Sequence, residues 1–468
     1  MRSFHEQIAA APGLSRRRFL TAGAIGGGLT LANLLRAEAA VGVGSSHKAV
    51  INIHLDGGPP QMDMIDLKPQ APAEIRGEFS PIATKVPGIQ ICELLPKLAA
   101  AADKVAFIRS LVGAASAHDA FQCQSGFDAK NLANVGGRPA MGSVVGKLKG
   151  SSADVAPAFV DLMQGRPLVR NSARPGFLGP TYKAFRPDIS HLFERPLEDK
   201  MVDELAAKGD GHTVALALSE HLSLNRLQDR TSLRSSLDRL RNKTDKSGMM
   251  DALDSFSQQA VGILTSGKFA AALDLTREDP RSLARYTLNT PDNAAPSTTS
   301  DRPNATLKFL LARRMIEAGV RCVSISISDF DTHSNNFGRL RKLLPIFDHG
   351  LTMLLADLEE RGMLDDVSIV CWGEFGRTPK VNASNGGRDH WPAVGMALLA
   401  GGGMRTGQVI GETDRYAAAA ISRPVHYQDV FATLYHNLGI SARQTTVTDP
   451  TGRPQYLLEH GEPLRELV

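Results

Sequence analysis

Residue types that bind metals or carry protons follow directly after apolar runs of this 468-residue chain. The densest example follows the run from 367 to 371, whose β-branched and apolar residues are typical of a strand buried on both faces. Gly373 and Gly376 then permit a sharp turn, which also carries Glu374 and Arg377. Because ligands of open α/β sheets bind at the carboxyl ends of the strands, this turn is well placed for chemistry.

The following loop adds a second carboxylate and an imidazole, Asp389 and His390, between a Gly-Gly pair and a Trp-Pro pair. A simpler interpretation stays open for the whole stretch. Glu374 could pair with Arg377, and Asp389 with Arg388, as solvated ion pairs that have no part in catalysis.

Two other predicted strands end in polar residues of the same types. The first strand, Ala49–Leu55, is followed by Asp56 and Asp63, which are either metal ligands or turn residues, since Asp is common in turns. The strand at 105–111 is followed by Ser116 and His118, the best local source of a nucleophile and a proton carrier. A plain loop with a helix cap is the alternative for that segment.

A fourth strand, predicted at 320–328, leads to Asp331 and His333. These residues are two positions apart, so their side chains face the same way in an extended backbone, as two ligands of one metal would. Carboxylates combined with imidazoles suit zinc, calcium, manganese or magnesium rather than a redox metal held by thiolates. The sequence therefore predicts a divalent metal site built from several strand ends.

Several longer motifs resemble the exported proteins of the DUF1501 family, a sulfatase-like branch of the alkaline-phosphatase superfamily. They are GGPPQMDMID, GEFGRTP, GGRDHWP and LLAGGGM, and the resemblance covers nearly the whole chain after residue 39. It implies an α/β fold with a mostly parallel central sheet flanked by helices. It also implies one or two metals that activate a nucleophile for phosphate or sulfate ester cleavage.

Carried onto this sequence, the resemblance suggests Asp331 and His333 for one half of a metal site and His390 as the closing ligand. Glu374 takes the place of the Asp that usually follows the corresponding strand. For the first strand, the resemblance favours Asp63 over Asp56. The sulfatase nucleophile signature is absent, and its nearest counterpart is Ser116, with Arg377 or His118 to neutralise the developing charge.

The first 39 residues are typical of a twin-arginine secretory leader: Arg16-Arg17-Arg18-Phe19-Leu20 precedes a short apolar run and an A-x-A site. Five Arg and two Glu give this leader a charge of +3, which accounts for most of the +4 of the chain. The remaining charge offers no argument for nucleic-acid binding, and no later apolar run is long enough to span a membrane. We therefore expect a protein exported, already folded, to the periplasm or beyond.

The remainder, 40–468, is predicted to form one sulfatase-like α/β domain with a helical insertion at about 190–285. Two of its four cysteines, Cys322 and Cys371, lie in strand-like runs and could be neighbours in one sheet. Helices are expected at 94–102, 136–149, 305–319, 340–361 and 428–438, and further strands at 156–163 and 394–400.

Two functions fit these observations. The first is an exported metal-dependent hydrolase that acts on small-molecule or glycan esters of phosphate or sulfate. The second is a non-catalytic relative that binds cell-surface glycans or partner proteins. The sequence identifies neither the metal nor any protein partner.

Overall fold

The computed structural model describes residues 48–118, 121–132, 136–151, 154, 156–163, 173–187, 189, 192, 203, 267–288 and 301–468. The predicted leader lies outside the described residues, as does most of the predicted helical insertion. The described end of that insertion, 267–285, contains two short α-helices, and no residue of it belongs to the sheet. The leader and the extent of the insertion therefore stay predictions.

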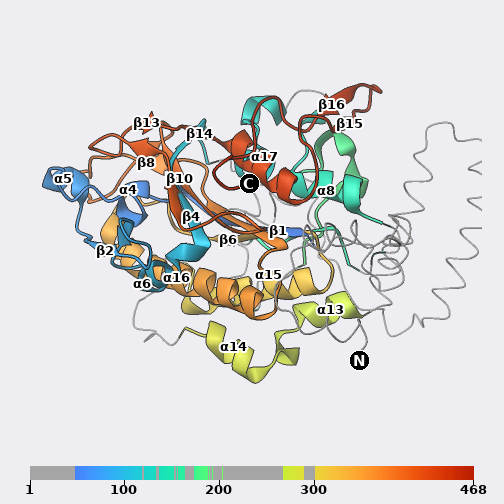
Figure 1. Cartoon of the computed structure of the whole chain (residues 1–468), viewed down its shortest axis with the longest axis horizontal. Helices are drawn as coiled ribbons and strands as arrows, with labels where there is room; N and C mark the ends of the chain where they lie inside the picture. Colours follow the sequence, from blue (N-terminus) through green and yellow to red (C-terminus); the bar gives the residue numbers. More distant parts are fainter. Residues whose placement is uncertain are drawn as a thin grey trace, which may run out of the picture. The chain divides into compact units, whose positions relative to one another are not determined.

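A mixed sheet of eight strands forms the centre of the described structure (Figure 1). Its main path runs β11-β4-β10-β7-β1-β6-β5, and β14 also pairs with β4. Each pairing is parallel except those of β10, which is antiparallel to both β4 and β7. The predicted mostly parallel sheet is confirmed. Its strands are β1 (Ala49–Leu55), β4 (Val105–Val112), β5 (Phe159–Asp161), β6 (Cys322–Ile327), β7 (Val367–Trp372), β10 (Gly395–Gly401), β11 (Gln408–Ile410) and β14 (Val425–His426).

Helices cover both faces of this sheet (Figure 1). One large apolar cluster joins the sheet to α6 (Pro96–Ala100), α15 (Leu307–Glu317) and α16 (Asn336–Glu360). A second cluster joins the other face to α7 (Phe121–Ser125), α8 (Met141–Lys149) and α17 (Tyr427–Asn437). The sheet is thus the middle layer of three, which is the usual arrangement for parallel strands because neither face can stay in water.

Shorter elements complete the described chain. The helices are α4 (Gln61–Met64), α5 (Ala73–Arg76), α13 (Lys268–Leu273) and α14 (Pro280–Tyr286), with 3-10 turns η1 (Ala102–Lys104), η2 (Ala129–Leu132), η4 (Gly176–Leu178), η5 (Pro180–Tyr182), η7 (Leu275–Arg277) and η8 (Pro303–Thr306). The small two-stranded sheets pair β2 (Pro81–Ala83) with β3 (Gln90–Cys92), β8 (Gly376–Arg377) with β9 (His390–Trp391), β12 (Glu412–Thr413) with β13 (Ala420–Ser422), and β15 (Thr446–Thr448) with β16 (Pro454–Tyr456). Among the described residues, no helix combines the length and apolar character needed to cross a membrane.

β1 is the middle of the parallel part of the sheet, with β6 on one side and β7 on the other. All seven of its residues are buried. Ile51 and Ile53 belong to the apolar cluster on the α16 side. Because strand side chains alternate between faces, Asn52 and His54 point to the α7 and α17 side. Asn52 bonds there to the indole of Trp372 (2.9 Å) and to the carbonyl of Cys123 (2.7 Å).

The two cysteines expected as neighbours are separated by β1. Cys322 lies on β6 opposite Val50, and Cys371 lies on β7 opposite Ile53. Their side chains also belong to the apolar clusters on opposite faces of the sheet. The possibility that they adjoin in one sheet is therefore wrong, because sequence pattern identifies strands but not which strand lies between them.

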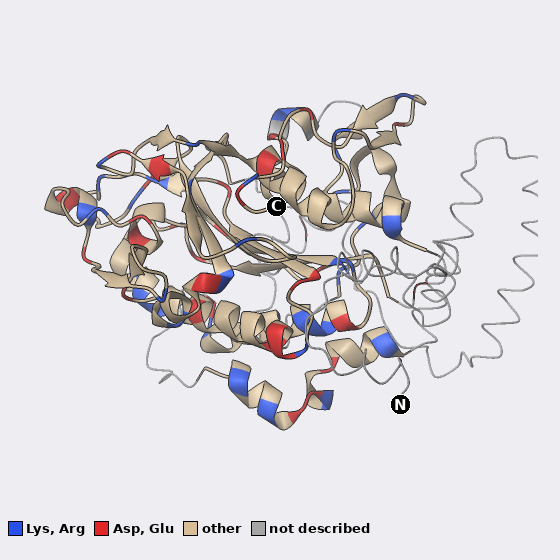
Figure 2. Ribbon diagram, in the orientation of Figure 1, with Lys and Arg blue, Asp and Glu red and all other residues tan. Residues whose placement is uncertain are grey.

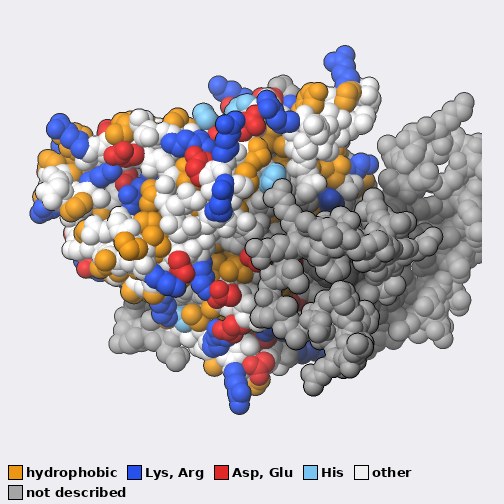
Figure 3. Space-filling model, in the orientation of Figure 1, with side chains coloured by type: hydrophobic (Ala, Val, Ile, Leu, Met, Phe, Trp, Pro, Cys, Tyr) orange, Lys and Arg blue, Asp and Glu red, His pale blue; other side chains and the backbone are white. Residues whose placement is uncertain are grey.

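The outer helices carry charges of both signs, visible along α14 and the segment before it (Figure 2). The face in Figure 3 likewise mixes basic, acidic and apolar side chains on its described part. One buried set of these charges holds the described end of the insertion. Glu278 contacts Arg313 of α15 (2.9 Å) and Arg314, and Arg313 also reaches Asp357 of α16 (2.9 Å). Burial raises the pKa of Glu278, but its hydrogen bonds to the two arginines outweigh burial and lower it.

We expect Glu278→Gln to lower the free energy of unfolding by about 1.5–3 kcal/mol at neutral pH, the range for hydrogen bonds to charged groups. Because the folded pKa is lowered, this contribution is present above the unfolded Glu pKa of about 4.3 and is lost as the pH falls through the folded value. Urea unfolding of both proteins at neutral and acid pH measures it. Glu360→Gln, which breaks an exposed pair with Arg285, is the control and should cost less. A loss that grows in acid would contradict this account.

Candidate metal centre

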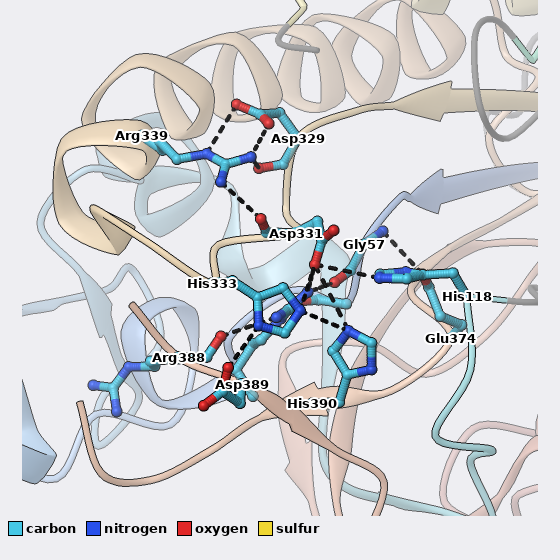
Figure 4. Close-up of polar contacts among 12 residues, drawn as sticks. Gly57, His118, Asp329, Asp331, His333, Arg339, Glu374, Arg388, Asp389 and His390 are labelled. Carbon is cyan, nitrogen blue, oxygen red and sulfur yellow. Dashed lines mark hydrogen bonds and ion pairs between the residues drawn. The ribbon is translucent and has the colours of Figure 1, made fainter. Parts of the chain in front are cut away.

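The carboxyl ends of four parallel strands meet at one edge of the sheet and bring distant residues together (Figure 4). β1 is followed by Asp56, β6 by Asp331 and β7 by Glu374, while His118 lies in the loop after β4. β10 runs antiparallel, so the segment before it reaches the same edge and contributes His390. This convergence follows from the direction of the strands.

Three imidazoles surround one carboxylate at this edge (Figure 4). The ligand-type atoms of His118, Asp331, His333 and His390 all lie within 4.8 Å of one another, and we call these four residues the imidazole group. Asp331 Oδ1 is 3.3 Å from His118 Nε2, 3.2 Å from His333 Nε2 and 3.7 Å from His390 Nε2. The Nε2 atoms of His333 and His390 are 2.9 Å apart.

The outer nitrogen of each imidazole faces an oxygen atom. His390 Nδ1 is 2.9 Å from the carbonyl of Ser116, and His333 Nδ1 is 2.6 Å from Asp389 Oδ1. His118 Nδ1 is 3.0 Å from Glu374 Oε1. A carbonyl or carboxylate oxygen only accepts, so each Nδ1 carries a proton, and the Nε2 of a neutral ring is left with its lone pair facing inward.

The inward direction of these lone pairs has an electrostatic consequence. The two Nε2 atoms at 2.9 Å would repel each other, and His118 Nε2 would repel the carboxylate of Asp331. A cation among them, either a proton or a metal ion, turns these repulsions into attractions. Burial lowers the pKa of His118, but hydrogen bonds to Asp331 and Glu374 raise it to about 9, so this ring favours its positively charged form.

A second set of ligand atoms adjoins the first and lies deeper. His54 Nε2 is 3.7 Å from Asp56 Oδ1 and 3.5 Å from Glu374 Oε2, and we call these three residues the buried group. Within the described part of the chain, neither ring nitrogen of His54 nor Glu374 Oε2 has a hydrogen-bond partner. Burial and the charge of Glu374 both raise the pKa of Asp56. These unpartnered atoms fit a cation, because burying them without one is costly.

Glu374 connects the two groups. Its Oε1 accepts from Gly57 N (3.0 Å) and faces His118 Nδ1, while its Oε2 faces His54. Asp331, His333 and His390, which the resemblance placed in one site, do lie together. Glu374 reaches them through the ring of His118 and belongs to the buried group.

Arg377 is buried and holds loops together in this structure. Its guanidinium is fully buried and donates to Asp331 Oδ1 (2.7 Å), to the carbonyls of Gly57 and Gly58, and to the carbonyl of Arg388 (2.9 Å). These four acceptors engage four of the five N–H groups of the guanidinium. In this structure Arg377 ties the ends of β1, β6 and β7 together, and its part in neutralising charge during catalysis stays a prediction.

Asp63, the carboxylate favoured by the resemblance, lies outside both groups. It forms a two-pronged ion pair with buried Arg388 (2.8 and 2.9 Å) and accepts from Asn336 (2.8 Å) at the start of α16. Both oxygens of Asp63 are thereby occupied, whereas Asp56 faces His54. These contacts give no support to the preference for Asp63 over Asp56 as a ligand, which stays a prediction.

The remaining candidates lie at the rim. Asp389 is more than half exposed and faces the outer nitrogen of His333. It therefore orients that ring and does not join the ligand atoms on the inner side of the ring. Ser116 is exposed, and its carbonyl faces His390. The solvated pairs considered from sequence, Glu374 with Arg377 and Asp389 with Arg388, are replaced by contacts that cross between strand ends.

Close backbone approach holds the loops that carry these residues. Gly57 has φ +104°, and a Cβ atom there would lie 2.2 Å from Asp331 N. A Cβ atom on Gly387 would lie 1.8 Å from the carbonyl oxygen of His333. Two glycines of the quoted motifs are thus needed so that the ligand-bearing loops can touch.

His54 is the residue that sequence reasoning missed. It lies inside the strand AVINIHL, where it was counted as part of a buried run. Two features of the sequence could have identified His54. It lies two positions before Asp56, and it shares one face of a buried strand with a second polar residue, Asn52.

The sequence profile described as "Protein of unknown function (DUF1501)" matches residues 47–468. The chain belongs to the DUF1501 family. No curated protein shows significant sequence similarity to this DUF1501 chain.

Solved structures that resemble it include two phosphonate monoester hydrolases. For that of Agrobacterium radiobacter the identity is 12% and the TM-score 0.30, over 84% of this chain and 74% of that one. For that of Silicibacter pomeroyi the identity is 12% and the TM-score 0.31, over 90% of this chain and 76% of that one. A third is BT4656 in complex with its substrate D-glucosamine-2-N,6-O-disulfate, at 12% and 0.30 over 90% and 82%. At these identities and scores, none assigns a chemistry to the DUF1501 chain.

We expect Asp63→Asn to destabilise the metal-free protein by about 3–5 kcal/mol, because it leaves Arg388 buried without its anionic partner. Urea unfolding in the presence of a chelator measures this. The matched change Asp389→Asn removes an exposed carboxylate and should leave that stability nearly unchanged. If Asp63→Asn instead kept full stability and lost metal uptake, Asp63 would be a ligand after all.

Proposed function

We propose that this protein is an exported, metal-dependent hydrolase of phosphate or sulfate esters. The observation that carries the proposal is the inward direction of the Nε2 atoms of His333 and His390, 2.9 Å apart and beside Asp331 Oδ1. Such an arrangement requires a cation, and three protein ligands of this kind are typical of catalytic metal sites.

Charge balance supports a divalent ion. With neutral imidazoles, the carboxylates of Asp56, Asp331, Glu374 and Asp389 outnumber the one guanidinium of the described residues that contacts them, that of Arg377. The resulting negative charge would repel an anionic ester. One divalent ion of zinc, manganese, calcium or magnesium at these ligands would reduce that negative charge, and two would reverse its sign.

The division of labour among the chain's residues then follows. Asp331, His333 and His390 hold one cation, and Asp56 and Glu374, with His54, are placed to hold a second. A bound divalent ion supplies Lewis acidity, which polarises an ester oxygen and stabilises the charge that develops on it. The hydroxyl of Ser116 is the chain's own candidate nucleophile, since its backbone lies against His390 on the exposed side.

Turnover of an aryl phosphate and an aryl sulfate by the metal-loaded protein tests this proposal. We expect chelation to abolish turnover and to lower the melting temperature, because a metal bound only by the folded state stabilises it. His333→Ala and His390→Ala should each weaken metal affinity at least about tenfold. Both variants should therefore lose the metal-dependent turnover and the metal-dependent rise in melting temperature. Ser116→Ala should lose turnover with its metal content unchanged.

His436→Ala changes an exposed histidine at the end of α17 and serves as the control. Hydrolysis that survives complete removal of metal would contradict the role of the metal. Equal hydrolysis by Ser116→Ala and the parent would contradict the role of Ser116 as nucleophile.

One observation favours a second candidate, a non-catalytic protein that binds surface glycans or partners. Among the described residues, two arginines that contact Asp331 are engaged with protein: Arg377 with its carboxylate, and Arg339 with its carbonyl and with Asp329. They are not directed at a substrate, as ester recognition by arginine requires. Metal-loaded protein that binds glycans but turns over no ester would support this candidate.

Export remains part of the proposal and rests on the leader sequence. Replacing Arg16 and Arg17 by Lys should leave the precursor in the cytoplasm, because the paired guanidinium groups identify the twin-arginine leader. Fractionation of cells followed by immunoblotting measures the distribution. Efficient export of the double variant would contradict the assignment.

A further inference from the structure

We propose that His118 is itself a metal ligand, so that the imidazole group is a four-ligand site of three Nε2 atoms and one carboxylate. We further infer that this site takes an imidazole-preferring divalent transition metal of the zinc class, and not calcium or magnesium. The inference deepens the cation site of the proposed function and rests on it, but does not depend on ester hydrolysis. From sequence, His118 was a proton carrier beside a nucleophile.

The distances fit a tetrahedral shell. Zinc–nitrogen and zinc–oxygen bonds of about 2.0–2.1 Å at tetrahedral angles place ligand atoms about 3.3 Å apart. His118 Nε2 lies 3.3 Å from Asp331 Oδ1, and His333 Nε2 lies 3.2 Å from it. The two distances from His390 Nε2 fall on either side of that value: 3.7 Å to Asp331 Oδ1 and 2.9 Å to His333 Nε2. Four of the six separations among the ligand atoms therefore lie within about 0.4 Å of the tetrahedral value.

The ring of His118 is held in the orientation that ligation needs. Its Nδ1 faces Glu374 Oε1 at 3.0 Å, the same type of outer contact that Asp389 makes with His333. A carboxylate on the outer nitrogen fixes the tautomer and makes the inner nitrogen a better ligand. Glu374 is fully buried and is itself fixed by Gly57 N, so this contact is rigid.

An aromatic wall keeps two of the three rings in place. Phe375, which is buried, lies 4.3 Å from the ring of His390 with a 30° tilt and 5.3 Å from the ring of His118. The two imidazoles meet edge to face at 4.5 Å. The apolar ring excludes water from one side of the group, which strengthens ligation inside it.

The donor set decides the class of metal. Calcium takes six to eight oxygen ligands and magnesium keeps oxygen ligands and water, whereas imidazole suits zinc, iron, nickel and copper. Three nitrogens to one oxygen is far from a calcium site. The open side lies at His333, whose side chain is 46% exposed, so a fifth position for an ester oxygen would be found there.

Cobalt(II) reports on this site without any assay of activity. Tetrahedral cobalt(II) absorbs visible light strongly, and octahedral cobalt(II) does so weakly. We expect the apoprotein to bind cobalt(II) with a tetrahedral spectrum that zinc removes and that equal concentrations of calcium or magnesium leave unchanged. His118→Ala should weaken cobalt(II) binding at least tenfold and change the spectrum, while His436→Ala should do neither.

A cysteine at the same position gives an independent readout. His118→Cys puts a thiolate on the loop that carries the proposed ligand, and a sulfur-to-cobalt charge-transfer band in this variant requires a folded site and a direct bond. An unchanged spectrum and affinity in His118→Ala together with no such band in His118→Cys would overturn the inference, as would displacement of cobalt(II) by calcium or magnesium.

The outcome is separable from that of the hydrolase proposal. If His118→Ala keeps the metal and its spectrum but the parent hydrolyses esters, the ligand assignment fails and the hydrolase stands. If the cobalt(II) results are as expected and no ester is turned over, His118 is a ligand in a protein that is not a hydrolase.

Discussion

The mutual repulsion of unprotonated imidazole nitrogens is the constraint on which the rest of this structure depends. Each Nδ1 of His118, His333 and His390 faces an oxygen that can only accept, so the inner nitrogens present lone pairs to one another and to Asp331. Only positive charge makes that arrangement stable. The carboxylates around it cannot supply such charge. The guanidinium of Arg377 contacts Asp331 Oδ1, and its other bonds go to loop carbonyls.

Backbone topology makes the convergence possible. Parallel strands end at one edge, so β1, β6, β7 and β4 deliver their following loops to a common place, and the reversed β10 delivers the segment that precedes it. Two buried guanidinium groups then tie these loops together. Arg377 holds the ends of β1 and β6, and Arg388 holds Asp63 beneath the segment that carries His390. The ligand geometry is therefore a property of the whole sheet edge.

Much of the fold could be predicted from sequence because its strands are buried on both faces and read as uninterrupted apolar runs. Ala49–Leu55 is β1 as predicted, and the strands predicted at 320–328 and from 367 onward are β6 and β7 within a few residues. Strand order could not be predicted, since an apolar run does not specify its neighbours. The supposed adjacency of Cys322 and Cys371 failed for that reason.

The site could be predicted only in part for a related reason. Asp331, His333 and His390 carried a local signal, namely ligand types placed just after a strand or in a glycine-bounded loop. The roles of Asp63 and Arg377 depended instead on partners about 325 and 46 positions away, as the ion pairs with Arg388 and Asp331 show. His54 was hidden inside a buried strand, where a histidine is usually structural.

The most direct test of the central claim is a crystal structure of zinc-loaded protein with data collected on both sides of the zinc absorption edge. The account predicts one strong anomalous peak within about 2.0–2.2 Å of Asp331 Oδ1 and of the Nε2 atoms of His333 and His390. A structure in which no peak lies among these atoms, with the two Nε2 atoms still in contact, would contradict it.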